Sequence, residues 1–222
     1  MTLITLSNGE SISTDKVLLG VGRRPNTDIN GLNNLNVEFN GRFIKANAYM
    51  QTNISNIYAI GDVVGNLQLA HIASHEGVIA VEHMLGHKVE PIDYSMVPFV
   101  IYGSPEMAGV GLTEKQAKTK NLSYKANTFY YAANGRAIAE GETTGIVKTL
   151  INTDNHKIIG VHIVGVGASD LLHQGVIAIK NGLTKEHFRK TIYAHPTLSE
   201  TFYESILNLH VPGKEKLLSS RG

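Results

Sequence analysis

The chain has 222 residues, of which 42% are hydrophobic and 18% charged, a balance that supports one large or two smaller soluble domains. Its formal net charge of +1 creates no field that would attract nucleic acid or an anionic membrane, so we expect neither as a partner. There is no cysteine, which excludes disulfides, thiolate metal sites and a thiol nucleophile within this chain. No apolar run is long enough to cross a bilayer.

The first 26 residues predict two strands and a loop, with no helix to cover them. Thr2–Leu6 alternates weakly and precedes the turn at residues 7–9, so it predicts half of a hairpin. Residues 16–19 (Lys-Val-Leu-Leu) are typical of a short buried strand, and they lead into the glycine-containing loop 20–26. We interpret strands without a covering helix at the start of the chain as a sign of a truncated protein.

The next segment predicts a loop, a strand and one long helix. Residues 27–42 are rich in Asn and Gly and predict a loop with one weak helical turn, and residues 49–52 are extended. Asn56–Ile60 predicts a buried strand that ends at Gly61 and Asp62. Leu69–Leu85 has helical spacing of its apolar residues, with Gly86 as the terminating glycine.

After a composition shift near residue 93 the pattern becomes antiparallel, with strands first and helices later, which favours an α+β fold. A capping box at Thr113 and Gln116 predicts a short helix start. The predicted strands are Val97–Tyr102, Met107–Gly111, Tyr124–Tyr131, Ile146–Ile151 and Lys157–Val164, and the predicted later helices are Ala168–Asn181, Thr184–Lys190 and Leu198–Leu209.

The most informative stretch is residues 193–200, because it places His195 and Glu200 five residues apart across a proline. An imidazole titrates near neutral pH and can accept a proton from a thiol or an alcohol, and a carboxylate bonded to it fixes its tautomer and stabilises the imidazolium. However, Thr197 and Glu200 also have capping-box spacing, and helix caps far outnumber catalytic pairs. By spacing alone, the cap is the favoured interpretation.

Two glycine clusters resemble the start of a dinucleotide-binding loop. The cluster at residues 165–170 follows a strand and opens a helix, but it lacks the third glycine and the following strand, so we interpret it as a tight turn. The cluster at residues 20–22 runs into Pro25 and Asn26, which favours a loop over a helix. Neither cluster predicts a pyrophosphate-binding loop.

Two other polar features remain open. Asp62 follows a predicted strand behind Gly61, a position that suits binding of a sugar or ribityl hydroxyl and suits equally a turn aspartate that bonds its own backbone. His71 and His75 have the spacing of two metal ligands on a helix, but no third ligand converges, so we predict no metal site.

At residues 195–200 (His-Pro-Thr-Leu-Ser-Glu) the sequence resembles the C-terminal part of the dihydrolipoamide dehydrogenases, within the flavin disulfide reductase family. Four further blocks resemble that family in the same order along the chain. They are residues 21–27, residues 51–63, residues 69–77 and residues 97–114. The resemblance covers essentially the whole chain, although Tyr193 stands where relatives commonly carry a histidine and Ile72 where a lysine is usual.

The resemblance implies a role for each matching residue. His195 is the implied acid–base catalyst toward the dihydrolipoyl thiol, and Glu200 orients it, with the pair acting on the redox disulfide of the other subunit of a homodimer. The His195–Pro196 bond is implied to be cis. The implied FAD-binding residues are Gly61, Asp62, Gln68, Leu69, Ala70 and His71, and Gly22 is implied to lie near the NAD site.

The resemblance also implies the organisation of the chain. Residues 1–27 correspond to the tail of an NAD-binding domain, residues 28–93 to the returning part of an FAD-binding domain, and residues 94–222 to an antiparallel dimerisation domain with flanking helices. The implied parent oxidises dihydrolipoyl groups carried by the acyltransferase of a 2-oxoacid dehydrogenase complex, in the bacterial cytoplasm or the mitochondrial matrix. We expect the chain alone to be inactive, to retain no FAD and to dimerise. The alternative is a non-catalytic dimerisation or assembly module.

Overall fold

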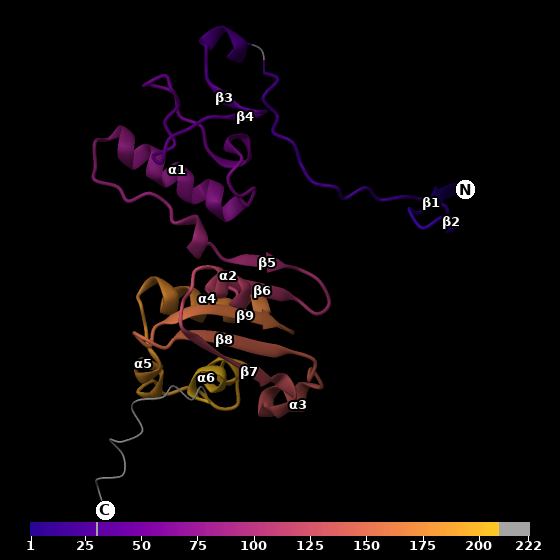
Figure 1. Ribbon diagram of the computed structural model, residues 1–222, viewed down its shortest axis with the longest axis vertical. Helices are drawn as coiled ribbons and strands as arrows, with labels where there is room; N and C mark the ends of the chain where they lie inside the picture. The colour runs from indigo at the N-terminus through magenta and orange to yellow at the C-terminus, as the bar shows by residue number, and fades with distance from the viewer. Residues whose placement is uncertain (30, 209–222) are drawn as a thin grey trace, which may run out of the picture. The chain divides into compact units, whose positions relative to one another are not determined.

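The computed structural model describes residues 1–29 and 31–208. The chain divides into two compact units, Met1–Ile92 and the residues from Asp93 onward, and each is described by itself. Figure 1 shows the elements of each unit, with the sheet of the second unit carrying the labels β5 to β9.

The N-terminal unit contains two small antiparallel hairpins. In the first, β1 (Thr2–Thr5) pairs with β2 (Ser11–Thr14), which confirms the hairpin predicted at the start of the chain. In the second, β3 (Phe39–Asn40) pairs with β4 (Phe43–Ile44) inside the segment predicted as a loop. The weak helical turn predicted there is the 3₁₀ helix Leu32–Leu35.

Two predicted strands of this unit are wrong. Residues 16–19 form no strand, and Leu18 and Leu19 are 96% and 78% exposed. Asn56–Ile60 forms only an isolated bridge, between Gln51 and Tyr58. An apolar run becomes a strand only when a neighbouring strand accepts its hydrogen bonds, and within the described residues neither run has a named strand beside it.

The long helix of the N-terminal unit is α1 (Ala70–Met84), as predicted, and Gly86 follows it in the left-handed conformation at φ 74°. Its central carboxylate is buried: Glu76 is 1% exposed and accepts a hydrogen bond of 2.6 Å from the Gly61 N–H. Glu76 therefore ties α1 to the 3₁₀ helix Gly61–Val64.

The C-terminal unit is built on one antiparallel sheet, which confirms the predicted α+β architecture. The order across the sheet is β5-β6-β9-β8-β7, so the hairpin β8–β9 is central and β5 and β7 are the edges. The strands are β5 (Phe99–Ile101), β6 (Met107–Gly111), β7 (Tyr124–Tyr130), β8 (Ile146–Asn152) and β9 (Ile158–Val164).

Within the described part of this unit, five α-helices accompany the sheet, four of them at predicted positions. The capping box of α2 is present in both directions between Thr113 and Gln116. The helix that was not predicted is α3, which Asn134 caps. The helices are α2 (Glu114–Thr119), α3 (Gly135–Glu140), α4 (Ala168–Lys180), α5 (Lys185–Arg189) and α6 (Ser199–Leu207); residue 209, where the last helix was predicted to end, lies outside the described residues.

The core lies between one face of the sheet and the helices α4 and α6. Val161 and Thr149 are cross-strand partners on that face and both are fully buried. Gly175 of α4 packs against Val161, and Ser205 of α6 forms a hydrogen bond of 2.7 Å with Thr149. Both helices therefore cover the same face, and α6 is fixed by polar as well as apolar contacts.

We predict that Gly175→Ala destabilises the C-terminal unit, although alanine is the better helix former. A Cβ at Gly175 would lie 2.9 Å from the Cβ of Val161, and such overpacking costs about 1–3 kcal/mol against a propensity gain of about 1 kcal/mol. Urea unfolding monitored by circular dichroism measures the change.

The matched control is Gly77→Ala in α1, where a Cβ would meet only the end of the Ile60 side chain at 3.4 Å. This substitution is expected to be neutral or stabilising. A stabilising Gly175→Ala would contradict the close packing of α4 on the sheet.

Candidate active site

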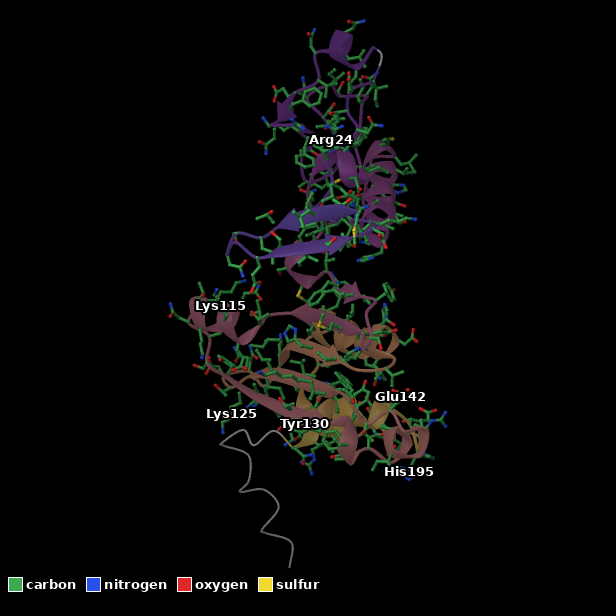
Figure 2. The ribbon with its side chains drawn as sticks, turned by 90° about the vertical axis from the view of Figure 1, so that its right-hand side faces the viewer. Arg24, Lys115, Lys125, Tyr130, Glu142 and His195 are labelled. Atoms are coloured by element: carbon green, nitrogen blue, oxygen red, sulfur yellow. The ribbon has the colours of Figure 1, made fainter. Side chains whose placement is uncertain are left out.

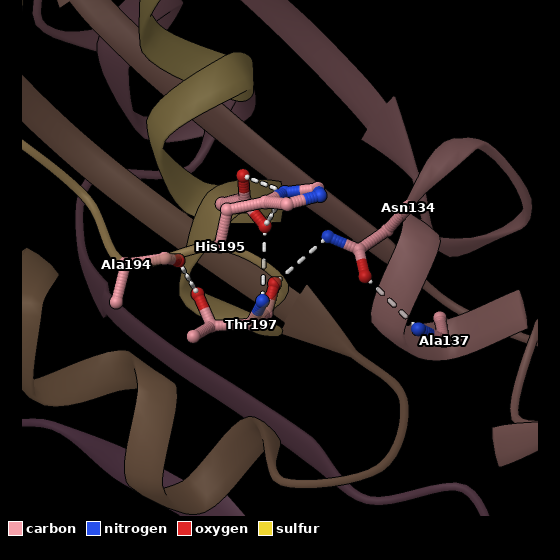
Figure 3. Close-up of polar contacts among 6 residues, drawn as sticks. Asn134, Ala137, Ala194, His195 and Thr197 are labelled. Carbon is pink, nitrogen blue, oxygen red and sulfur yellow. Dashed lines mark hydrogen bonds and ion pairs between the residues drawn. The ribbon is translucent and has the colours of Figure 1, made fainter. Parts of the chain in front are cut away.

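His195 and Glu200 lie against each other at the start of α6. The His195 Nδ1 is 2.9 Å from one Glu200 carboxylate oxygen and 3.2 Å from the other. Glu200 projects from the first turn of α6, whereas His195 belongs to the loop that precedes this helix (Figure 3). The geometry is that of an imidazole whose Nδ1 is bonded to a carboxylate, which orients the ring and stabilises its protonated form.

The same carboxylate also caps the loop backbone. The Thr197 N–H donates a hydrogen bond of 2.9 Å to Glu200 Oε2, as one half of a capping box requires. The other half, in which the Thr197 hydroxyl would accept from the Glu200 N–H, is not formed. The Thr197 hydroxyl donates to the Ala194 carbonyl at 2.8 Å, and the N-cap position falls on Leu198. The cap and the His–Glu pair, which the spacing presented as alternatives, coexist on one side chain.

The electrostatics of the pair favour an ionised carboxylate. The Thr197 N–H, followed by the hydrogen bond and charge of His195, holds the pKa of Glu200 below its ordinary value, although partial burial opposes this shift. The Glu200 side chain is 23% exposed and that of His195 is 74% exposed. Figure 2 shows His195 on the outside of its unit, so the imidazole is accessible to a reacting group.

Asn134 is a member of this site that the sequence analysis missed. It is 3% exposed; its amide nitrogen donates to the Thr197 carbonyl at 3.0 Å, and its amide oxygen accepts from the Ala137 N–H at 2.9 Å (Figure 3). An asparagine before a short run that ends at Gly141 could have indicated the cap of α3. The bond to Thr197 spans 63 residues and leaves no local signal. The His195–Pro196 peptide bond beside it is cis, as the resemblance implied.

Tyr193 is part of a neutral hydrogen-bond network. Its hydroxyl donates to the side-chain amide oxygen of Gln174 at 3.0 Å, and its ring packs against Tyr203 with centroids 4.7 Å apart. Burial, followed by the proximity of Tyr203, raises the pKa of Tyr193 to about 12. Tyr193 therefore stays a hydrogen-bond donor over the physiological pH range and is not a base.

In the N-terminal unit, Arg23 connects two of the residues predicted to bind the cofactor, Asp62 and Gln68. Its guanidinium lies 3.4 Å from the Asp62 carboxylate and donates at 2.7 Å to the Gln68 carbonyl. Gly61 precedes Asp62 in the left-handed conformation, at φ 73°. The amide nitrogen of Gln68 is buried and has no hydrogen-bond partner within the described residues. These groups form a cluster with an unused donor.

The other predicted cofactor residues begin α1 or lie apart. Leu69 occupies the N-cap position without a side-chain cap, Ala70 is the first helical residue and His71 is exposed. Gly22 lies in an irregular loop at φ 106°, and a Cβ there would meet no heavy atom within 4 Å. The start of α1 therefore presents backbone N–H groups and the positive end of the helix dipole.

The glycine cluster at residues 165–170 forms a turn that the chain itself closes. Gly167 takes the left-handed conformation at the start of α4. The Ser169 N–H and hydroxyl donate to one carboxylate oxygen of Glu106, at 3.1 and 2.9 Å. A carboxylate of the same chain thus lies where a phosphate would have to bind.

Residues 1–29 and 31–208 contain neither a candidate metal site nor a candidate membrane span. This part of the chain has no group of three or more His, Cys, Asp or Glu side chains arranged to hold a metal ion, and both His71 and His75 are exposed. None of its helices is long and apolar enough to span a membrane.

Comparison with protein families gives two matches. Residues 97–206 match the dimerisation domain of the pyridine nucleotide-disulphide oxidoreductases. Residues 1–77 match a second domain described as pyridine nucleotide-disulphide oxidoreductase. The first match contains the whole sheet of the C-terminal unit and both residues of the His195–Glu200 pair.

Curated relatives of the chain are dihydrolipoyl dehydrogenases. One from Bacillus subtilis is 43% identical over 202 residues, which are 90% of this chain and 43% of the relative. The mitochondrial enzyme of Canis lupus familiaris is 45% identical over 199 residues, 89% of this chain and 39% of the relative. The chain spans less than half the length of these relatives.

Solved structures show the same fold. LpdA from Mycobacterium tuberculosis aligns with a TM-score of 0.86 and 28% identity over 92% of this chain and 45% of that chain. The HOCl-induced flavoprotein disulfide reductase RclA from Escherichia coli aligns with a TM-score of 0.86 and 25% identity over 92% of this chain and 48% of that chain.

We predict that the stabilising contribution of the Glu200 charge depends on pH. Because the pKa of Glu200 is lower in the folded chain than in the unfolded chain, this contribution is complete above the ordinary glutamate pKa of about 4.3 and is lost as the pH falls through the lowered value. The difference in melting temperature between the native chain and Glu200→Gln should therefore be largest near pH 6 and shrink below pH ~4. A difference that stays constant down to pH ~2.5 would contradict the ion pair.

Proposed function

Because the chain belongs to the pyridine nucleotide-disulphide oxidoreductase family, we propose that it works as part of a dihydrolipoyl dehydrogenase. In this reaction a dihydrolipoyl group loses two protons and two electrons to become a disulfide, and the electrons pass to NAD. The observation that carries the proposal is the bond of 2.9 Å between the exposed His195 imidazole and the Glu200 carboxylate. An accessible imidazole with a fixed carboxylate partner suits proton removal from a thiol.

In this proposal His195 accepts the thiol proton and Glu200 stabilises the imidazolium that results. The hydrogen bond from Nδ1 to the carboxylate assigns Nε2 as the nitrogen that exchanges the proton. Glu200 needs no proton of its own, because the Thr197 N–H keeps its pKa low. The chain contains no cysteine, so the redox disulfide that the resulting thiolate attacks must belong to residues outside this sequence.

We propose that the N-terminal unit contributes part of an FAD site. When bound, FAD would accept the electrons and pass them to NAD. The unused Gln68 amide nitrogen supports this placement, as do the Asp62 carboxylate, which is 45% exposed, and the uncapped start of α1. Asp62 would bind a hydroxyl of the ribityl chain, residues 69–71 would lie along the flavin, and Gly22 would lie near NAD. Retention of FAD by this chain alone is not expected, because neither of its glycine clusters predicts a loop that binds a pyrophosphate.

The proposed assembly is a homodimer in which His195 serves the disulfide of the other subunit. The match to a dimerisation domain supports this, together with exposed apolar side chains on that domain such as Ile101 and Ile177, which are 51% and 59% exposed. The proposed partner of the whole enzyme is the lipoyl-bearing acyltransferase of a 2-oxoacid dehydrogenase complex. The proposed location is the bacterial cytoplasm or the mitochondrial matrix.

The competing proposal is a non-catalytic dimerisation module. It is favoured by one observation, that the Thr197 N–H already gives Glu200 a structural role as a cap. Under this alternative the His195 imidazole has no proton to transfer, and its replacement has no effect on catalysis.

One prediction of the proposed function concerns the chain by itself. Purified, it should be colourless, show no NADH formation with dihydrolipoamide, and sediment as a dimer, because it has no cysteine and no predicted pyrophosphate-binding loop while it keeps the dimerisation domain. Absorbance at flavin wavelengths, a spectrophotometric assay and analytical ultracentrifugation measure the three properties. A monomer, or a yellow and active preparation, would contradict this assignment.

Another prediction uses a chimera. In it, this chain is preceded by the N-terminal segment of the Bacillus subtilis relative, up to the residue at which the two sequences begin to match. His195→Gln should lower kcat by roughly 10²–10⁴, the range typical of a general base. The control is His87→Gln, which removes a histidine paired with Glu82 in the other unit and should leave kcat nearly unchanged. Equal and mild effects of both substitutions would support the non-catalytic module.

A further inference from the structure

We propose that Asn134 is a positioning residue of the His195–Glu200 pair, because its side-chain amide bridges the start of α3 to the Thr197 carbonyl and so holds the loop that carries His195. The bridge connects segments 63 residues apart through a side chain that is 3% exposed. The consequence for catalysis rests on the proposed function; the positioning itself does not.

The amide uses both of its ends. Its oxygen accepts the Ala137 N–H at 2.9 Å, and its nitrogen donates to the Thr197 carbonyl at 3.0 Å. A cap alone requires only the oxygen, and serine or aspartate would supply one equally well. The second bond requires a donor of the length of asparagine, and its acceptor belongs to the residue whose N–H bonds Glu200. Asn134 and Glu200 thus hold the Thr197 peptide groups from two directions.

The segment that precedes Asn134 is closely packed. Tyr131 lies three residues before it, is fully buried, and donates its hydroxyl to the Val166 carbonyl at 3.1 Å. The ring fits there because Gly145 and Gly165 lack side chains: a Cβ at either position would lie 2.8 Å from a ring carbon. The Asn134 N–H in turn donates to the Tyr131 carbonyl at 2.8 Å. The amide is therefore presented from a packed element rather than from a free loop.

The neighbouring residue faces the imidazole. A Cβ built at Gly135 would lie 3.9 Å from His195 Cε1, which is ordinary van der Waals distance. The first residues of α3 thus fix the Thr197 peptide by a hydrogen bond and border the ring of His195. Without the bridge, the loop would be free to move at Thr197. Both contacts of Glu200, with the Thr197 N–H and with His195, depend on the position of this loop.

The test uses three substitutions in the 222-residue chain. Asn134→Asp and Asn134→Ser keep an oxygen to cap α3 and remove the donor to Thr197, and the serine variant does so without adding charge. The control is Asn127→Asp. The Asn127 amide also donates to a backbone carbonyl of α6, that of Ser205 at 3.0 Å, but it does not bond the loop that carries His195. Melting temperature, and the titration of Glu200 and His195 followed by NMR, are measured for each variant.

We expect both Asn134 variants to raise the pKa of Glu200 toward its ordinary value of about 4.3, because the Thr197 N–H is no longer held against the carboxylate. Asn127→Asp should lower the melting temperature and leave the Glu200 titration as it is in the native chain. A folded Asn134→Ser with an unchanged Glu200 titration would overturn the proposal. So would loss of folding in both Asn134 variants, because Asn134 would then act on the fold as a whole.

Activity of the chimera separates this proposal from the proposed function. Asn134→Ser should lower kcat by about tenfold to a hundredfold, the size expected for a small misplacement of a catalytic group, and change KM little. A shifted titration with unchanged kcat would keep the positioning role and refute the catalytic pair. An unchanged titration in a chimera that His195→Gln inactivates would refute the positioning role and keep the catalytic pair.

Discussion

The hydrogen bond from the Thr197 N–H to Glu200 is the interaction on which the candidate active site depends. It fixes one carboxylate oxygen by the backbone, lowers the pKa of the carboxyl, and leaves the group able to bond the His195 Nδ1. A carboxylate has two oxygens and several acceptor positions, so one side chain can cap a helix start and orient a base. For this residue, stability and chemistry are therefore aspects of the same contact.

The pair combines a fixed carboxylate with an exposed imidazole. Glu200 is carried by α6, which is held in the core by Phe202 and Ile206, both fully buried, and by the bond between Ser205 and Thr149. His195 is carried by a loop and stays 74% exposed. A base must reach a reacting group, whereas its partner must not move, and placing the partner on a packed helix satisfies both requirements.

Local patterns in the sequence predicted the elements whose causes are local. The β8–β9 hairpin, α1 and the capping box of α2 each follow from periodicity, turn residues or caps within a few positions. The strand predicted at residues 16–19 is wrong, because a strand depends on a neighbouring strand that no local pattern reveals. The Asn134–Thr197 bond was missed for the same reason, since its two ends are brought together only by the fold. His195 and Glu200 could be named, but their distance could not.

Glu76, Glu106 and Glu200 each use a carboxylate to hold a backbone N–H group, and a comparison shows how their surroundings differ. Glu76 bonds the Gly61 N–H and the Asn66 amide, and is 1% exposed. Glu106 spends one oxygen on both the N–H and the hydroxyl of Ser169. Glu200 joins its backbone contact to an exposed titratable ring. Glu76 and Glu106 hold elements of the fold together, whereas Glu200 joins a helix start to a solvent-accessible imidazole, the arrangement on which the proposed proton transfer rests.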